Sequence, residues 1–317
     1  MKDYEYINSV LGTKFNSDKE LEYHWAYIST HPKLTEELIN KYHDKIMMRI
    51  IDYKVLQNCS IDFFRKYKNE LNWRFISLNV ALSEEMIEEF KDILFWQYIV
   101  VNSKLSDKLI EYALTRECAS YTVAIYQNLS EDFIEKHSEL FLNEVCVYKY
   151  HKISDEFIQK HINDFTKEIC RCILIYQNIS ETIQKQLKKK IKGYVPRISN
   201  WIRNVSPIKK KNAIEKLDLY ECYDDYFIAY KAIREDRYSL CTLQYKYEKG
   251  KTYESWCDCT QDENSFGLNV GTEEFAKEYG AHYFDYIIVK CKVKYEDVGR
   301  IVHKGQKIRC FKLEVLD

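Results

Sequence analysis

The stretch LSEDFIEKH at residues 129–137 returns as ISDEFIQKH at residues 153–161. Both copies share a six-residue pattern: an aliphatic residue, Ser or Thr, two mostly acidic residues, a large apolar residue and usually Ile. The Ser or Thr of this pattern occurs seven times, at intervals of 23 to 26 residues: Thr35, Ser60, Ser83, Ser106, Ser130, Ser154 and Ser180. Such even spacing indicates an internal repeat.

The chemistry of this pattern predicts the start of a helix. A Ser or Thr hydroxyl accepts a hydrogen bond from a free backbone N–H of the first turn, which makes these residues good N-caps. Acidic residues in that first turn are favoured by the positive end of the helix dipole. We therefore expect a helix of about ten residues, the A helix, to follow each Ser or Thr.

A second apolar cluster halfway through each repeat predicts a B helix. It reads WAYI at residues 25–28, WRFI at 73–76 and WQYI at 96–99, with weaker copies near residues 121, 145 and 170. The spacing of Trp and Ile places both on one helical face. Two short helices in about 24 residues bury their apolar faces only by stacking on neighbours, so we expect a solenoid.

The aromatic stripe and the histidines of the repeats are interpreted as structural residues. We expect Trp25, Trp73, Trp96, Phe133 and Phe157 to form the repeat core. A separate set of repeat residues is expected at the surface or in turns, without metal-binding roles: His137, His151 and His161.

The C-terminal part reads as a different kind of domain. Segments 226–233, 238–247, 286–293 and 307–316 are rich in Tyr, Ile, Val and Phe, which favours strands. Thr272 reads as the N-cap of a helix, and segments 249–251 and 303–306 read as turns. We therefore predict an α+β protein: a cap at 1–19, seven repeats at 20–195, a basic connector at 196–221, and an α+β domain with an antiparallel or mixed sheet at 222–317.

The strongest local charge lies at residues 185–216, which hold eleven basic residues and one acid, Glu215. The segment is either a solvated helix that covers the last repeat or an anion-binding stripe for nucleic acid or an acidic partner. An aromatic side chain such as Trp201 is suited to stacking on bases. The residues predicted to bind in the second case are Lys188, Lys189, Lys190, Lys209, Lys210, Lys211 and Trp201.

Motifs for catalysis and metals are weak. The sequence contains no phosphate loop and no dinucleotide fingerprint. Cys257 and Cys259 form a lone Cys-x-Cys pair, so we expect packed thiols, no metal site and no resident cofactor. The chain has 11 cysteines, an odd number, which argues against a complete disulfide framework.

The order of elements from Tyr230 to Glu314 resembles the ADP-ribosyltransferase core. In that family an early strand supplies Arg or His, a middle strand supplies Ser, Thr or Tyr, and a late strand supplies Glu. The resemblance implies that Arg234 or Tyr230 holds NAD, that Ser265 supports the nicotinamide side, and that Glu314 polarises the ribose. The alternative function that follows is a transferase whose target is selected by the repeats.

The repeat stretches at 129–137 and 153–161 also resemble short helical repeats of large DNA viruses and of phages of low-GC bacteria. Residues 230–316 are similar to a small phage-associated domain of uncharacterised function. These resemblances imply an interaction protein, such as a virus-encoded inhibitor that binds and occludes a host defence complex without catalysis. Its partner would be a host protein complex or a second copy of the chain.

The remaining expectations concern location. No apolar stretch reaches about 18 residues, so we expect neither a membrane-spanning helix nor a membrane partner. The first residues carry acids and lack the apolar core of a secretory signal. We therefore expect the protein to remain in the cytoplasm of the producing or infected cell.

Overall fold

A computed structural model describes most of the chain and divides it into two compact units, Met1–Ser103 and Lys104–Asp317. This division falls inside the predicted repeat array. The described residues are 2–116, 118–177, 179–191, 205–255, 257–258, 263, 265, 267–283 and 285–317.

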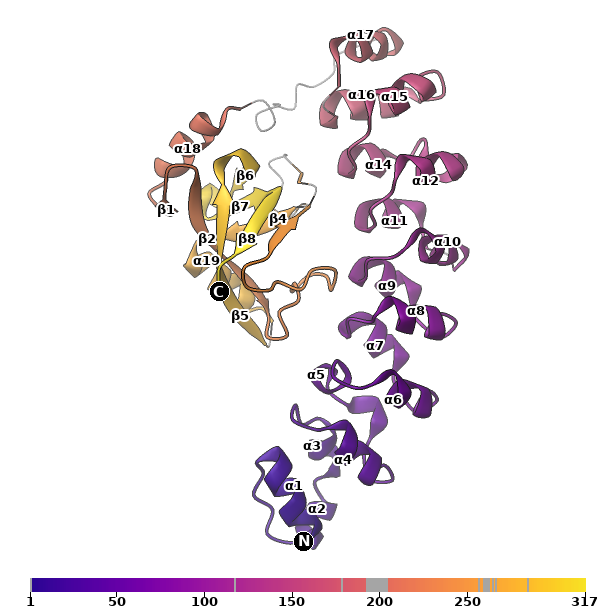
Figure 1. Ribbon diagram of the computed structural model, residues 1–317, viewed down its shortest axis with the longest axis vertical. Coiled ribbons are helices and arrows are strands. Elements are labelled where there is room, and N and C mark those ends of the chain that lie inside the picture. Colours follow the sequence, from indigo (N-terminus) through magenta and orange to yellow (C-terminus); the bar gives the residue numbers. More distant parts are fainter. Residues whose placement is uncertain are drawn as a thin grey trace. The chain divides into compact units, whose positions relative to one another are not determined.

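The first unit is entirely helical and follows the predicted repeat. Its A helices lie in one row and its B helices in another (Figure 1). The N-terminal helices are α1 (Asp3–Leu11) and α2 (Asp18–Glu22). The A helices are α4 (Glu36–Lys41), α6 (Ile61–Lys66) and α8 (Glu84–Phe90). The B helices are α3 (Trp25–Ser29), α5 (Tyr53–Leu56), α7 (Trp73–Asn79) and α9 (Trp96–Asn102), and a 3-10 turn, η1 (Met48–Ile50), precedes α5.

The second unit begins with further repeats of the same kind. Its A helices are α10 (Asp107–Thr115), α12 (Glu131–Lys136), α15 (Asp155–His161) and α17 (Glu181–Lys190). Its B helices are α11 (Ser120–Tyr126), α14 (Val145–Tyr150) and α16 (Lys167–Tyr176), and a short α13 (Ser138–Phe141) follows α12. The chain is therefore helical over most of its N-terminal part, as the sequence predicts.

The predicted caps are confirmed at six of the seven positions, all of which are described. Ser130 Oγ, for example, accepts from Phe133 N at 3.1 Å, and Thr35 Oγ1 accepts from Leu38 N at 3.2 Å. Ser106 begins α10 without a side-chain cap bond. The A helices are mostly shorter than predicted, with six or seven residues in α4, α6, α8, α12 and α15. The aromatic stripe is buried as expected, since Trp25, Trp73, Trp96, Phe133 and Phe157 are all at most 9% exposed.

Buried side chains at the ends of several B helices connect them to the preceding repeat. Asn102 Nδ2 donates to the Leu78 carbonyl at 2.9 Å, and His151 Nε2 bonds the Ala124 carbonyl at 2.7 Å. Gln177 is in the position that corresponds to His151, three residues before a cap serine. It donates to two carbonyls of the preceding B helix and its end. These residues supply the polar partners that helix ends require when they are buried.

The acidic residues after each cap have a second role. The carboxylate of Glu131 accepts hydrogen bonds from the backbone and hydroxyl of Ser154, which caps the next A helix. Glu36 makes the same two bonds to Ser60, at 2.9 Å each. The Ser-acid pair therefore starts one helix and also links it to the next repeat, which explains its regular recurrence.

The C-terminal part of the second unit is an antiparallel sheet with few helices. In the described residues the strand order is β3-β8-β5-β2-β4-β7-β6, with β1 paired to β2. The strands are β1 (Glu221–Cys222), β2 (Tyr226–Arg234), β3 (Thr252–Glu254), β4 (Leu268–Gly271), β5 (Tyr286–Lys294), β6 (Val298–Val302), β7 (Lys307–Cys310) and β8 (Lys312–Val315). Helix α18 (Pro207–Glu215) precedes the sheet, and α19 (Glu273–Gly280) packs on β2, β4 and β5.

Two of the four predicted strands differ from the structure. Segments 226–233 and 286–293 form β2 and β5, but segment 238–247 forms only isolated bridges, such as the one from Tyr238 to Lys246. Segment 307–316 is divided into β7 and β8 at Phe311, whose N–H donates to the Asp297 carbonyl. The chain thus changes partner strand at this residue, which alternating apolar residues alone do not reveal.

The other C-terminal predictions fit the structure more closely. Thr272 caps α19 as expected, with Oγ1 accepting from Phe275 N at 3.1 Å. The predicted turns occur at Gly250 and around His303, where backbone φ is positive. Every strand pair in the described sheet is antiparallel, so the α+β class is confirmed. Among the described residues no helix combines the length and apolar character needed to cross a bilayer.

Candidate functional sites

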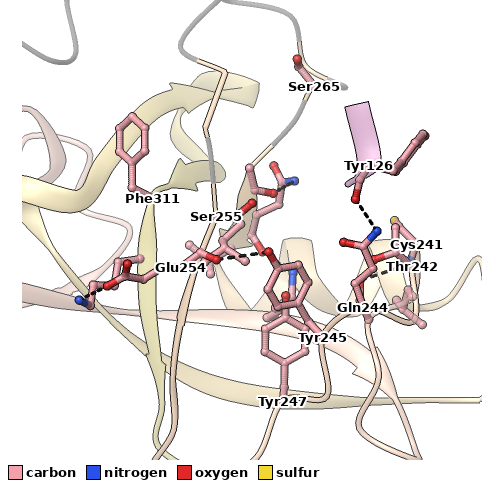
Figure 2. Close-up of a pocket in the computed structure, with 18 of the residues that line it drawn as sticks. Tyr126, Cys241, Thr242, Gln244, Tyr245, Tyr247, Glu254, Ser255, Ser265 and Phe311 are labelled. Atoms are coloured by element: carbon pink, nitrogen blue, oxygen red, sulfur yellow. Dashed lines mark hydrogen bonds and ion pairs between the residues drawn. The ribbon is translucent and has the colours of Figure 1, made fainter. Parts of the chain in front are cut away.

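A cavity of about 1130 Å³ lies in the second unit. Strands β2, β4 and β7, helix α19 and the loop at 239–245 line it, together with side chains of the repeats that include Tyr126. Figure 2 shows Gln244 of the loop donating its amide to the Tyr126 carbonyl, at 2.8 Å. It also shows the Tyr245 hydroxyl on the Glu254 carbonyl, at 3.2 Å. The loop is therefore held on two sides, and the cavity has a defined wall.

Lys231 enters this cavity at an opening between two strands. In the described residues β2 pairs with β4 at Tyr230 and Gly271 alone, so the ladder ends there. Lys231 Nζ donates to the Asn269 carbonyl at 2.9 Å and lies 5.1 Å from the Tyr247 ring centroid. Burial lowers the pKa of this ammonium group, because the low-dielectric surroundings disfavour its charge.

A second lysine, Lys307 on β7, lies at the same cavity. The register places Tyr230, Gly271 and Lys307 in one row across three strands. Lys307 is 8% exposed, and its Nζ donates to the Glu263 carbonyl at 2.6 Å. Burial and the nearby Arg309 charge both lower the pKa of Lys307. A side chain at Gly271 would come within 2.6 Å of the Gln306 carbonyl, so a glycine is required between them.

A thiol and a phenol line the cavity on the α19 side, and a second phenol lies next to them. Cys241 Sγ lies 3.1 Å from the Tyr279 hydroxyl, which is 3.4 Å from the Tyr283 hydroxyl. Burial is the main cause of the raised pKa of Tyr279, so this phenol stays protonated near neutral pH. The cavity lining therefore offers lysines, carboxylates, hydroxyl groups and aromatic rings. Of the residues predicted from the sequence, Tyr230 and Ser265 line this cavity, whereas neither Lys231 nor Lys307 was predicted.

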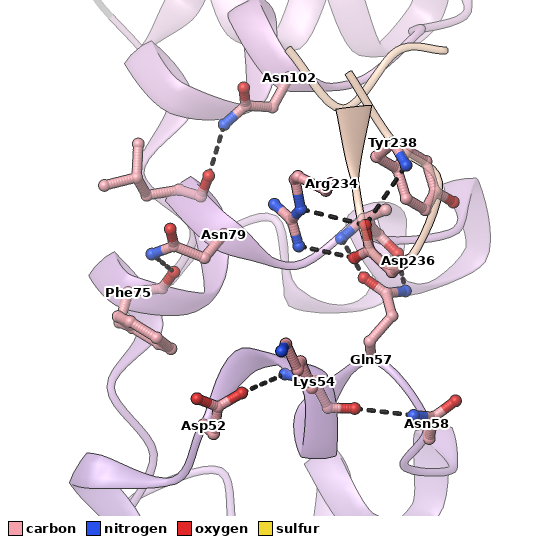
Figure 3. Close-up of polar contacts among 12 residues, drawn as sticks. Asp52, Lys54, Gln57, Asn58, Phe75, Asn79, Asn102, Arg234, Asp236 and Tyr238 are labelled. Carbon is pink, nitrogen blue, oxygen red and sulfur yellow. Dashed lines mark hydrogen bonds and ion pairs between the residues drawn. The ribbon is translucent and has the colours of Figure 1, made fainter. Parts of the chain in front are cut away.

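The structure does not bring the predicted transferase residues together. Arg234 is opposite Tyr286 at one end of the β2–β5 ladder, whereas Glu314 is opposite Lys292 on β5. The two positions are six residues apart along β5, or roughly 20 Å at the rise of a strand. Arg234 forms an ion pair with Asp236 at 2.7 Å (Figure 3), and Glu314 lies 3.7 Å from Lys292.

The other two predicted transferase residues line the cavity without forming a shared NAD site with Arg234 and Glu314. Tyr230 is in the cross-strand row with Lys307 described above. Ser265 donates its hydroxyl to the Asp258 carboxylate, which is itself buried. This serine hydroxyl is therefore engaged by a neighbouring carboxylate within the protein.

Three lysines of the basic segment have structural contacts. Lys190 Nζ donates to carbonyls of the preceding repeat, including Asn163 O at 3.1 Å. Lys210 is 3% exposed and donates to the Glu296 carbonyl at 2.9 Å. Lys211 lies 3.7 Å from both Glu215 and Asp224. The Lys190 contact fits the interpretation of a helix that covers the repeats, whereas Lys210 and Lys211 lie on α18 and contact the C-terminal part of the chain.

The other residues predicted to bind are three lysines and Trp201. Lys188, Lys189 and Lys209 are exposed. Trp201 lies outside the described residues. Lys188 and Lys189 are in the last turn of α17, where the helix dipole favours positive charge. Their position therefore has a structural explanation that does not require nucleic acid.

The cysteine pair and the repeat histidines complete the predicted candidates. Cys257 is a buried thiol, packed so closely that a side chain at Gly299 would lie 2.1 Å from its sulfur, while Cys259 is outside the described residues. Within the described part of the chain, no group of three His, Cys, Asp or Glu side chains is placed to hold a metal. His151 lies in the turn after α14, one of the two expected locations, but it is 7% exposed and links two repeats and is therefore not a surface residue. His137 and His161 are half-buried against Phe133 and Phe157 in their own A helices.

The first unit presents a different candidate surface, which we call the B face. It consists of the exposed apolar side chains on the B helices and on the turns that lead into them. Tyr27 on α3 is 53% exposed, Leu78 on α7 is 46% exposed, and Phe95 at the start of α9 is 38% exposed. The full set is Tyr23, Tyr27, Met47, Ile50, Leu78 and Phe95.

The A helices of the same unit expose charged side chains instead. Arg65 on α6 contacts Glu89 on α8 at 2.6 Å and Asp62 at 2.7 Å. In residues 2–103 every large hydrophobic residue that is exposed belongs to the B half of a repeat or to the turn before it. The two rows of helices therefore differ in chemistry as well as in position.

Comparison with protein-family models, with curated proteins and with solved structures finds no match for this chain.

Proposed function

We propose that the protein binds another protein through the B face of its first unit. The observation that carries this proposal is that the exposed large apolar side chains of residues 2–103 are confined to the B halves of the repeats. An exposed set of large apolar side chains on a folded surface is typical of an interaction site. Tyrosine is also among the residues that contribute most to binding at interfaces.

The repeat architecture makes this surface suitable for binding without large rearrangement. Ser77 Oγ donates to the Trp73 carbonyl at 2.7 Å and accepts from Phe95 N at 3.1 Å. The same arrangement occurs two repeats earlier. There Ser29 Oγ donates to the Trp25 carbonyl and accepts from Met47 N at 2.9 Å. Phe95 and Met47 are thus held at equivalent positions by buried serines. A surface ordered before binding loses less conformational entropy when a partner binds.

The resemblance of the repeats to those of phages and large DNA viruses extends this proposal. A viral protein with a rigid apolar surface and no required chemistry is suited to occluding a host complex. We propose such an inhibitor as the biological role, with a host defence complex as the partner. The structural support for this extension is limited to the B face, and the viral setting rests on the resemblance.

The test compares two variants of the full chain in quantitative capture of partners from host-cell lysate. Tyr27→Glu combined with Leu78→Glu places charge on the B face, whereas Glu85→Lys changes the charge of an exposed A-helix position on α8. A B-face interaction predicts that a stoichiometric partner is lost, by at least tenfold, only with the first variant. Equal capture by both variants, with circular dichroism showing both folded, contradicts the proposal.

Self-association is distinguished by a separate measurement. If the partner is a second copy, sedimentation of the purified wild-type chain will show a dimer, and the B-face variant will sediment as a monomer. A wild-type monomer that captures a host protein supports the heterologous interaction instead.

A further inference from the structure

We propose that the cavity of the second unit binds a small phosphorylated molecule that carries a planar ring, of the nucleotide class. The inference is independent of the B face, since it concerns the sheet and not the first unit. It rests on two lysines that point into one cavity from different strands. They are Lys231 on β2 and Lys307 on β7.

Neither ammonium group has a hydrogen-bonded carboxylate partner among the described residues. Lys231 Nζ is bound to the Asn269 carbonyl, and Lys307 Nζ is bound to the Glu263 carbonyl. The Glu263 carboxylate lies instead at 3.2 Å from His303. Removing an ammonium group from water is costly unless an opposite charge compensates for it. A neutral amide side chain would donate a hydrogen bond to such a carbonyl equally well. The carbonyl partners therefore do not explain why these two side chains carry a positive charge.

Two like charges are placed near each other, because Lys231 and Lys307 line the same cavity. Burial, the Arg309 charge and the Lys231 charge lower the pKa of Lys307, whereas the Glu263 carboxylate acts in the opposite direction. Arg309 itself is directed toward Asp258, with Nη1 at 2.9 Å from its carbonyl oxygen. Lys104, Lys312, Glu254 and Asp297 also line the cavity, so its lining holds four lysines against two carboxylates. An anion between Lys231 and Lys307 would relieve the repulsion between them.

The side chains that line the cavity indicate which kind of anion it would bind. Lysine acts as a compact point charge and is a common phosphate ligand, whereas planar carboxylates favour the paired donors of arginine. Aromatic side chains of Tyr230, Tyr245 and Phe275 line the same cavity and offer surfaces for stacking on a ring. A volume of about 1130 Å³ is large enough for a molecule of nucleotide size.

The experiment is calorimetric titration of the full-length protein with adenosine monophosphate and with inorganic phosphate. We expect saturable binding of the nucleotide, at least tenfold tighter than that of phosphate because of ring stacking. Lys231→Met and Lys307→Met should each weaken nucleotide binding at least tenfold. The control, Lys251→Met, removes an exposed lysine that pairs with Glu248 outside the cavity, and should change affinity less than twofold.

Thermal unfolding of each ligand-free variant separates loss of the site from loss of the fold. The proposal predicts that Lys307→Met keeps or raises the melting temperature while it removes nucleotide binding. Wild-type affinity in both cavity variants would overturn the proposal. So would a wild-type protein that binds neither nucleotide nor phosphate at millimolar concentration, or one that binds benzoate in preference to both.

Discussion

Polar groups are buried in both the repeats and the C-terminal sheet, but their partners differ. In the repeats each buried amide or imidazole bonds a neighbour one repeat away, as Gln177 does with Tyr148, His151 and Ile153. In the sheet Lys307 is buried and Lys231 is half-buried, and each has a main-chain carbonyl as its hydrogen-bond partner. The first arrangement completes the fold, whereas in the second neither ammonium group bonds a carboxylate among the described residues.

This difference indicates which polar groups stabilise the protein and which do not. A repeat protein is stabilised mainly by contacts between neighbouring units, so a residue that bridges two units should be costly to remove. A buried charge without a counterion should instead reduce stability. Substitutions in the two regions should therefore change the free energy of unfolding in opposite directions.

The largest effect is expected for Gln177→Ala. Its side chain accepts from Ile153 N at 3.0 Å and donates to the Tyr148 and His151 carbonyls at 2.5 and 2.8 Å. Truncation leaves these groups buried without that partner, and we expect the free energy of unfolding to fall by about 3 kcal/mol. Urea denaturation followed by circular dichroism measures it. Gln159→Ala, at an exposed position of α15, should change it by less than about 0.5 kcal/mol.

A smaller loss is expected for Ser77→Ala in the first unit. The Ser77 hydroxyl is fully buried and bonds both the Trp73 carbonyl and Phe95 N. We expect destabilisation of about 1 to 2 kcal/mol, because two buried main-chain groups lose a partner. Ser9→Ala removes an exposed hydroxyl that makes a similar bond to the Tyr6 carbonyl and is the matched control. Equal losses in the two variants would show that burial does not determine the cost.

The sheet should respond in the opposite direction. Lys307→Met keeps the length of the side chain and removes a charge that is 8% exposed. We expect the ligand-free protein to gain about 1 kcal/mol in free energy of unfolding, as occurs when buried charges are replaced by apolar groups. Destabilisation of similar size would place Lys307 with the structural residues of the repeats and remove the contrast.

The smallest effect concerns pH. Burial lowers the pKa of His151 from its ordinary value of 6.5, so its neutral ring donates Nε2–H to the Ala124 carbonyl. The unfolded chain takes up a proton below that value more readily than the folded chain does. Stability contributed by this histidine is therefore present above pH 6.5 and is lost as pH falls.

His151→Gln tests this linkage with the residue that the chain itself uses at Gln127 and Gln177. We expect the variant to match the wild type in stability at pH 7 and to become the more stable of the two as the pH falls below 6.5. Denaturant midpoints across that range measure the difference. Parallel pH profiles for the two proteins would show that His151 does not contribute to acid destabilisation.

The sequence was sufficient to predict the repeats because each repeat carries its own local signals. Ser130 and Ser154 are N-caps whose chemistry is independent of the rest of the fold. The polar bridge made by Gln177 was not predicted, since a Gln near a turn reads as exposed. His151 was misjudged for the same reason, although its position three residues before Ser154 matches that of Gln177 before Ser180.

The sheet was harder to predict because its pairing is non-local. The break at Phe311 depends on Asp297, 14 residues earlier in the chain, and segment 238–247 has strand-forming residues without a ladder. The lysines of the cavity gave no local signal, since Lys231 follows Tyr230 in an ordinary strand pattern. A Lys on an otherwise buried strand is the one feature that would have identified it.

The most direct test of the proposed function is covalent surface labelling of the protein alone and in complex with its captured partner. The account predicts that labelling of Tyr27, Leu78 and Phe95 on the B face decreases in the complex. Glu85 and other exposed A-helix positions should react as they do in the protein alone. Protection confined to the A helices, or an unchanged B face in a stoichiometric complex, would contradict it.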